Sequence, residues 1–208
     1  MRIIFLDLDT LRPDHLGCYG YFRNTSPNID SIAREGVRFT RYYCSDAPCL
    51  PSRSALSSGM FGIHNGAVGH GGTAADQFIE GEERGFRARF ASTNLFQLFR
   101  RAGMYTASIS TFAERHTSYW YYGGFNEIHN VGSGGGERAD QVSPIAIDWI
   151  KKNGKKDNWF LHINMWDAHT TYRTPAEFGN PFEADDFFEH TWMTQEIIDR
   201  QRKEASPH

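Results

Sequence analysis

No apolar run in this 208-residue sequence is long enough to cross a membrane, so we expect no membrane-spanning helix and no membrane partner. The formal net charge of −3 provides no basic surface, and we therefore expect no nucleic-acid partner either. Three cysteines are too few for a disulfide framework. The sequence also contains no G-x-G-x-x-G, and its Gly-rich run at 132–136 precedes no Lys-Ser or Lys-Thr pair, which argues against dinucleotide and P-loop nucleotide binding.

We expect no secretory signal in residues 1–8, because Met1 and Arg2 lead into a short apolar run that soon meets Asp7. A cytoplasmic location is therefore the default expectation; a periplasmic or secreted location applies if a signal has been removed. The length is sufficient for one large domain or two small ones with a real core. Aromatic residues make up 14% of the chain, which suits a domain with an aromatic-lined cleft.

What the sequence does contain is an alternation of strand and helix patterns. The expected strands are 2–8, 37–43, 105–110 and 159–166, and the expected helices are 27–35, 49–58, 93–101 and 139–152. This order predicts an α/β fold, an α/β/α sandwich with a mainly parallel central sheet. Residues 74–91 are expected to form a solvated excursion. Residues 176–208 form a separate acidic, aromatic tail with a terminal helix at about 194–203, after a main portion at 1–175.

The most informative stretch is Cys49-Leu50-Pro51-Ser52-Arg53. Pro is favoured in the first turn of a helix and Gly just past its end, so Pro51 and Gly59 predict a short helix. Cys49 then lies at the helix N-terminus, where free amides and the positive dipole end favour an anion. Arg53 follows one turn later and can point back toward Cys49. A lone cysteine would indicate a core residue. Here a cysteine, an anion-binding helix N-terminus and a guanidinium lie within five residues of one another.

Carboxylates collect at the end of the first predicted strand. Asp7 and Asp9 are two residues apart and therefore lie on the same strand face. In open α/β sheets, ligands bind at the carboxyl ends of the strands. Both carboxylates are therefore candidate ligand-binding groups, with a plain strand-end role as the alternative for Asp7.

The Cys-x-Pro-Ser-Arg pattern resembles the signature of the type I sulfatases. The stretch from Asp9 to Tyr21 and the loop from Trp166 to Tyr172 resemble sulfatase motifs as well, in the same order along the chain. The resemblance covers residues 1 to about 175 and implies an alkaline-phosphatase-like fold and hydrolysis of sulfate esters. It implies that a maturase oxidises Cys49 to formylglycine, whose hydrated aldehyde is the nucleophile, and that Arg53 holds this group.

The same resemblance implies a divalent cation, Ca²⁺, bound by oxygen ligands that include Asp9 and the formylglycine at position 49. Asp7 is a further candidate ligand. Many family members carry two adjacent Asp residues where this chain has Asp9-Thr10. Ca²⁺ takes six to eight oxygen ligands, and these residues supply only part of that number.

Basic residues that follow the later strands complete the candidate site. The resemblance implies that Arg115 and His116, after the strand at 105–110, contact the sulfate. It implies that His169, in the loop after the strand at 159–166, assists them. His70 lies in a Gly- and His-rich loop and is either a substrate contact or a solvated surface histidine. The expected substrate is a sulfated small molecule or sugar.

Two other functions remain open. Relatives that hydrolyse phosphonate monoesters or phosphate diesters share the Cys motif, and a sulfatase-like binding module with an unmodified Cys49 would have no activity. Sulfatases are typically more than twice this long, and residues 172–208 contain no Asp-His-Gly or Asp-Asn-Gly. We therefore expect an incomplete chain that binds Ca²⁺ weakly and turns over sulfate esters poorly. We also expect it to expose a sheet edge that favours homo-oligomers.

Overall fold

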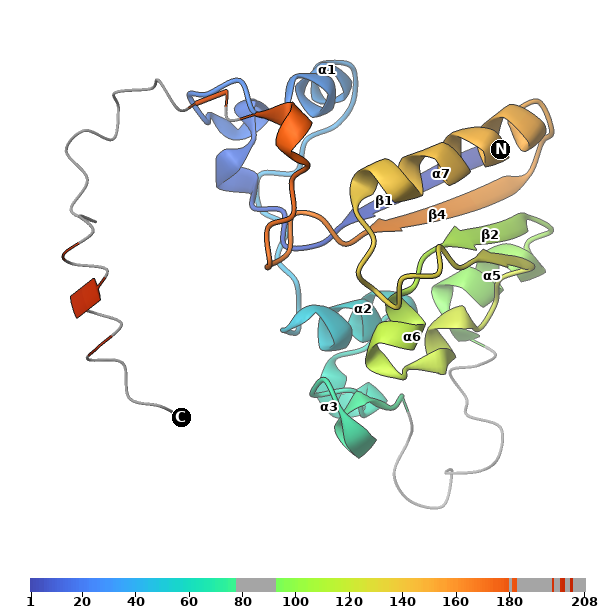
Figure 1. The fold of residues 1–208 in the computed structure, drawn as a ribbon. Helices are drawn as coiled ribbons and strands as arrows, with labels where there is room; N and C mark the ends of the chain where they lie inside the picture. The colour runs from blue at the N-terminus through green and yellow to red at the C-terminus, as the bar shows by residue number, and fades with distance from the viewer. Residues whose placement is uncertain (78–92, 180, 183–195, 197–198, 201–202, 204–208) are drawn as a thin grey trace. The chain divides into compact units, whose positions relative to one another are not determined.

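The computed structural model describes residues 1–77, 93–179, 181–182, 196, 199–200 and 203. The chain divides into two compact units, Met1–Arg173 and Thr174–His208. All described strands belong to the first unit (Figure 1). The division after residue 175 into a catalytic portion and a tail stays a prediction.

A four-stranded parallel sheet forms the centre of the first unit, with the order β1-β4-β2-β3. The strands are β1 (Arg2–Leu8), β2 (Tyr105–Ile109), β3 (Glu127–His129) and β4 (Trp159–Met165). The predicted strands at 2–8, 105–110 and 159–166 are confirmed. The three-residue β3 is too short for a recognisable alternation, which is why the sequence did not reveal it.

Helices cover both faces of the sheet (Figure 1). Ala107, Val142, Trp149 and Leu161 belong to the core on the α7 side, and Leu50, Phe96, Phe112 and Phe160 belong to the core on the other side. Because neighbouring residues of a strand face opposite sides, the almost entirely buried β4 can contribute apolar side chains to both cores. The predicted α/β/α arrangement is therefore confirmed.

The elements outside the sheet are α1 (Pro27–Glu35), α2 (Cys49–Ser58), α3 (Gly62–Asn65), α5 (Leu95–Arg101), α6 (Phe112–His116), α7 (Ala139–Asn153), η1 (Pro13–His15), η2 (Gly17–Tyr19), η3 (Gly72–Ala75), η4 (Tyr119–Tyr122) and η5 (Ala176–Phe178).

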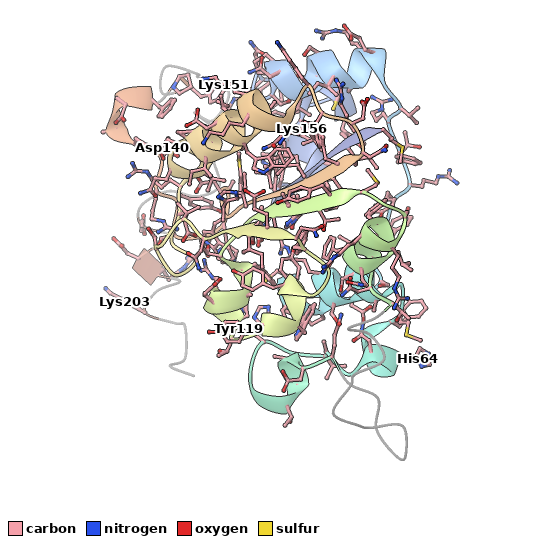
Figure 2. The ribbon with its side chains drawn as sticks, turned by 90° about the vertical axis from the view of Figure 1, so that its right-hand side faces the viewer. His64, Tyr119, Asp140, Lys151, Lys156 and Lys203 are labelled. Atoms are coloured by element: carbon pink, nitrogen blue, oxygen red, sulfur yellow. The ribbon has the colours of Figure 1, made fainter. Side chains whose placement is uncertain are left out.

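Local sequence signals explain most helix ends. Asn94 caps α5, since its side chain accepts a hydrogen bond from the Gln97 amide. Asp140 in the first turn of α7 and Lys151 in its last turn match the helix dipole; both are labelled in Figure 2. Gly59 follows α2 with a φ of 68°, a left-handed conformation that glycine adopts without strain.

The predicted strand at 37–43 is wrong. These residues form no strand in the structure, and Phe39, Tyr42 and Tyr43 are exposed. An alternating pattern becomes a strand only if a neighbouring backbone completes the hydrogen-bond ladder. Among the described residues, β1 has one neighbour, β4, and lies at the edge of the sheet.

The predicted excursion at 74–91 and the predicted terminal helix at 194–203 lie mostly outside the described residues. Residues 78–92 of the predicted excursion are not described, and neither is most of the predicted terminal helix at 194–203. Within the described part of the chain, no helix is both long and apolar enough to cross a bilayer.

Candidate active site

The carboxyl end of β1, the loop after β4 and the N-terminus of α2 meet at a cleft of about 460 Å³. Asp9, Cys49, Arg53, His70 and His169 are among the residues that line it. These side chains come from β1, from α2 and from loops that are distant in sequence. A parallel sheet collects such groups at one edge because all its strands end there.

Cys49 is the first residue of α2, and its thiol lies between two imidazoles. Its Sγ is 3.2 Å from Nε2 of His70 and 3.8 Å from Nε2 of His116. Burial and the negative charge of Asp9 raise the pKa of the Cys49 thiol, and the positive charge of Arg53 offsets only part of this effect. The unmodified side chain is therefore a protonated thiol at neutral pH.

Arg53 lies one helical turn beyond Cys49 and is buried, with 6% of its surface exposed. Its Nε and Nη2 donate hydrogen bonds to both carboxylate oxygens of Asp7, at 2.7 and 2.9 Å. Its Nη1 donates to Oδ2 of Asp9 at 3.0 Å. The guanidinium also lies over the ring of Phe112, 4.5 Å from the ring centre. Arg53 thus connects the start of α2 to the end of β1.

Asp9 is buried at the point where β1 ends, and both of its carboxylate oxygens have partners. Oδ2 accepts from Arg53, and Oδ1 accepts from the Thr10 hydroxyl at 2.8 Å. The backbone of Asp9 binds the end of β4 as well, since its amide donates to the Met165 carbonyl and its carbonyl accepts from the Ala168 amide. The structure therefore holds Asp9 rigidly beside the cleft.

Asp7 is partly buried and also lines the cleft, and hydrogen-bond donors surround its carboxylate. Besides Arg53, the Nδ2 group of Asn164 donates to Asp7 Oδ2 at 3.1 Å, and Nε2 of His162 lies 3.6 Å from the same oxygen. Burial alone would raise the pKa of Asp7, but the hydrogen bonding of His162 and the charge of Arg53 together lower it. Asp7 is therefore an ionised carboxylate surrounded by hydrogen-bond donors.

Arg115 and His116 form the end of α6 at the same edge of the sheet. His116 contacts Cys49, as described above. Arg115 lies over the ring of Trp166 and donates to the carbonyl of Gly135. Gly135 has a φ of 89°, and a Cβ there would come within 2.6 Å of Arg115 Cβ, so this position requires glycine.

His116 is neutral at neutral pH. Burial, followed by the nearby His70 and Arg115, lowers the pKa of His116 to about 4. A neutral imidazole can accept a proton, which is what a general base beside position 49 must do.

The lowered pKa predicts that acid weakens the fold through His116. The unfolded chain binds a proton on this residue near its ordinary pKa of 6.5, whereas the folded chain does so only near 4. The free energy of unfolding therefore decreases as the pH falls through this window. We expect the urea midpoint of the unmodified chain to drop more between about pH 7 and about pH 5 than that of His116→Gln. Equal drops would contradict the shifted pKa.

His169 lines the cleft from the loop after β4. Its ring lies 4.0 Å from that of Trp166, centre to centre, and its Nδ1 is 2.5 Å from the Thr170 carbonyl. The structure thus brings all the predicted site residues to one edge of the sheet. Within this group, Arg115 and His116 do not line the cleft; Arg115 lies over the Trp166 ring and His116 contacts Cys49.

Sequence reasoning missed the residues behind Asp7. They are Ser108, Tyr121, His162 and Asn164, all buried and polar or partly polar. A signal was present in the sequence, because His162 and Asn164 occupy alternate positions of a strand that is otherwise apolar, and alternate residues share a face. A buried polar residue in such a strand indicates a specific partner.

The described residues do not complete a cation site. Among them, no group of three or more His, Cys, Asp or Glu side chains is arranged to hold a metal ion. Asp9 lines the cleft together with Cys49, and its oxygens already accept hydrogen bonds from Arg53 and Thr10. This donor set falls well short of the six to eight oxygens that Ca²⁺ takes.

Known proteins with similar sequences are sulfatases. The match to arylsulfatase A of Homo sapiens is 41% identical over 65 residues, which is 31% of this chain and 13% of that protein. An uncharacterized sulfatase of Escherichia coli, YidJ, is 22% identical over 90% of this chain and 42% of its own length. The chain therefore spans less than half the length of these relatives.

Solved structures share the fold. A putative sulfatase from Bacteroides thetaiotaomicron matches with a TM-score of 0.61 at 18% identity, over 81% of this chain and 35% of that one. The phosphonate monoester hydrolase of Agrobacterium radiobacter gives 0.57 at 19% identity, over 85% and 43%. A protein solved with its substrate D-glucosamine-2-N,6-O-disulfate gives 0.56 at 18% identity, over 97% and 47%.

A family model also covers the residues that form the cleft at the carboxyl edge of the sheet. The family model described as Sulfatase matches residues 2–201, which include every element of that edge. The chain belongs to the sulfatase family.

Proposed function

We propose that this protein hydrolyses sulfate esters, with a formylglycine derived from Cys49 as the nucleophile. One observation carries the proposal: Cys49 begins α2 with its thiol between His70 and His116, and Arg53 lies one turn behind it. An anion at this point would meet the free amides of a ten-residue helix and a buried guanidinium. Membership of the sulfatase family supports the same reaction.

The state of the thiol supports its conversion into another nucleophile. Cysteines that attack substrates have a lowered pKa, since the thiolate is the reactive form. Burial and Asp9 raise the pKa of Cys49 instead. An unmodified Cys49 would therefore be a poor nucleophile, whereas a hydrated aldehyde at the same position carries two hydroxyl groups between the same histidines.

In the first step, one hydroxyl of the hydrated aldehyde gives its proton to the neutral His116, and its oxygen attacks the sulfur. The bond from sulfur to the ester oxygen breaks, and the leaving alcohol takes a proton from a histidine, for which His169 and His70 at the cleft are the candidates. The charge that develops on the sulfate faces Arg53, Arg115 and the α2 N-terminus.

In the second step, the remaining hydroxyl loses its proton to a histidine. The bond between carbon and the sulfate oxygen breaks, sulfate leaves, and the aldehyde forms again and takes up water. The two steps balance without any external oxidant or reductant, because the aldehyde carbon returns to its starting state.

Sulfatases generally use a divalent cation, and Ca²⁺ stays part of the proposal with Asp9 and position 49 as its ligands in this chain. Such an ion would supply positive charge next to the sulfate oxygens. The described residues do not complete its coordination, so every step above is assigned to protein groups alone.

A sulfated sugar or other sulfated small molecule is the proposed substrate. Support comes from the neighbour whose structure holds D-glucosamine-2-N,6-O-disulfate, which shares the fold over 97% of this chain. The cleft of about 460 Å³ has the size of a small-molecule site.

The test is to coexpress the protein with a formylglycine-generating maturase and to measure turnover of an aryl sulfate and of the matching aryl phosphonate monoester. Mass spectrometry of the peptide that contains Cys49 should detect the aldehyde in place of the thiol. Faster turnover of the sulfate supports the proposal. A fully retained thiol, in a host that modifies a control sulfatase, would contradict the mechanism.

Phosphonate monoester hydrolysis is the second candidate, because an enzyme named for that reaction shares the fold over 85% of this chain. It predicts the reverse preference in the same assay. A retained thiol together with undetectable turnover of both compounds would instead favour a sulfatase-like binding module.

A further inference from the structure

A buried polar cluster contacts Asp7 at the candidate active site, and the proposed steps do not use it. His162 of β4 is fully buried, with Nδ1 3.0 Å from the Ser108 hydroxyl and Nε2 3.2 Å from the Tyr121 hydroxyl. The same Nε2 is 3.6 Å from Asp7, and Asn164 donates to Asp7 at 3.1 Å. Burying polar groups costs free energy unless each one has a hydrogen-bond partner, and these side chains are partners of one another. Such a network holds its members in one arrangement.

Asp7 links this cluster to Arg53. A guanidinium is planar, so two parallel hydrogen bonds to one carboxylate fix both its position and the rotation of its plane. Because Asp7 binds Nε and Nη2, the plane of the guanidinium is fixed, and Nη1 donates its hydrogen bond to Asp9. The orientation of Arg53 beside position 49 is thus determined by Asp7.

The surroundings of Asp7 differ from those of a cation ligand. Arg53 occupies both carboxylate oxygens, and the Asn164 amide adds a second donor to Oδ2. A cation requires oxygen acceptors around it, whereas the groups that face Asp7 present N–H bonds. The register of the sheet creates this arrangement, because Asp7 pairs with Asn164 across β1 and β4.

We propose that Asp7, held by His162 and Asn164, is a positioning residue that orients the Arg53 guanidinium beside position 49, and that it is not a ligand of the cation. The inference rests on the proposed function, in which Arg53 stabilises charge at that position. It predicts that Asp7 affects the rate of the chemical step through Arg53 and has no effect of its own.

The test compares Asp7→Asn with wild type in the matured protein, using an aryl sulfate. Asparagine keeps the shape of the side chain but replaces one acceptor oxygen with an amide donor that faces Arg53. We expect kcat to fall about 10- to 100-fold while KM stays within about threefold, because the reacting groups are misplaced and not removed. Asp140→Asn is the matched control, since Asp140 is an exposed carboxylate paired with Arg138 at the start of α7 (Figure 2). Its kcat should equal that of wild type.

Two further measurements separate positioning from the other roles. The Ca²⁺ concentration for half-maximal activity should be the same in Asp7→Asn and wild type, and an increase would make Asp7 a ligand and overturn the proposal. The double variant Asp7→Asn/Arg53→Ala should be no slower than Arg53→Ala alone, because the two residues act as one unit. Additive losses, or an unchanged kcat in Asp7→Asn, would overturn it as well.

Failure of the proposed function gives a different result. If matured wild type turns over no sulfate ester, the unmodified chain still allows a urea-unfolding cycle with Asp7→Asn, Arg53→Ala and the double variant. Coupling between the two substitutions supports the link from Asp7 to Arg53, and independent effects on the unfolding midpoint contradict it. His162→Gln, which keeps an amide donor in the cluster, should shift the midpoint in the same direction as Asp7→Asn.

Discussion

Cys49→Ala is expected to abolish turnover of sulfate esters, with a loss on the order of 10⁶-fold, the size found where other catalytic nucleophiles are removed. The reason is that alanine can neither become an aldehyde nor carry the two hydroxyl groups that the proposed cycle needs. His70, His116 and Arg53 would remain in position but would have no nucleophile to activate.

The measurement is aryl sulfate turnover after coexpression with the maturase. Cys18→Ala is the matched control, because it removes a thiol near Asp30, away from the residues of the cleft. It should be converted at position 49 as wild type is and should keep its activity. Turnover in Cys49→Ala within about tenfold of wild type would mean that another group attacks the sulfur.

Arg53→Ala is expected to lose about 2–4 kcal/mol of transition-state stabilisation, the cost of deleting one well-placed donor next to a developing anion. That corresponds to roughly 30- to 1,000-fold in kcat/KM. The guanidinium lies one turn from position 49 and binds Asp7 and Asp9. Its loss removes positive charge from the site and leaves the buried Asp9 and the partly buried Asp7 without their cationic partner.

The same substitution should therefore weaken the fold, because removing one partner of a buried ion pair costs about 3–5 kcal/mol. Urea unfolding of the unmodified chain measures this loss, and kcat/KM must be measured where the variant is fully folded. Arg53→Lys is the informative comparison, since it keeps the charge but cannot bind Asp7 with two parallel hydrogen bonds. A decrease in kcat/KM of less than about threefold in Arg53→Ala would assign Arg53 a purely structural role.

Local patterns in the sequence were sufficient for most of the framework. The apolar run at 2–8 and the residues at 159–166 predict buried strands, and the structure contains both as β1 and β4. β4 is buried as predicted, whereas β1 lies at the edge of the described sheet and leaves Ile4 and Leu6 exposed. The Cys49 motif predicts its helix from Pro51 and Gly59 alone, since those residues act within one or two turns.

Patterns failed where a partner distant in sequence decides the outcome. Residues 37–43 alternate like a strand, yet no described strand pairs with them. The three residues of β3 show no pattern of their own and form a strand because β2 lies beside them. In both cases the ladder of hydrogen bonds, which is a property of two segments, overrides the preference of one.

The candidate site also has features that the sequence predicts and features that depend on contacts between distant segments. The sequence by itself was sufficient to predict which residues carry the proposed chemistry, because Cys49 and Arg53 are one helical turn apart and Asp9 ends an apolar strand. Only the tertiary structure decided which groups Asp7 contacts. Its partners His162 and Asn164 lie more than 150 residues further along the chain, and the parallel register of β1 and β4 brings Asn164 opposite Asp7. Sequence spacing describes distances within one element, whereas contacts between elements arise when the sheet forms.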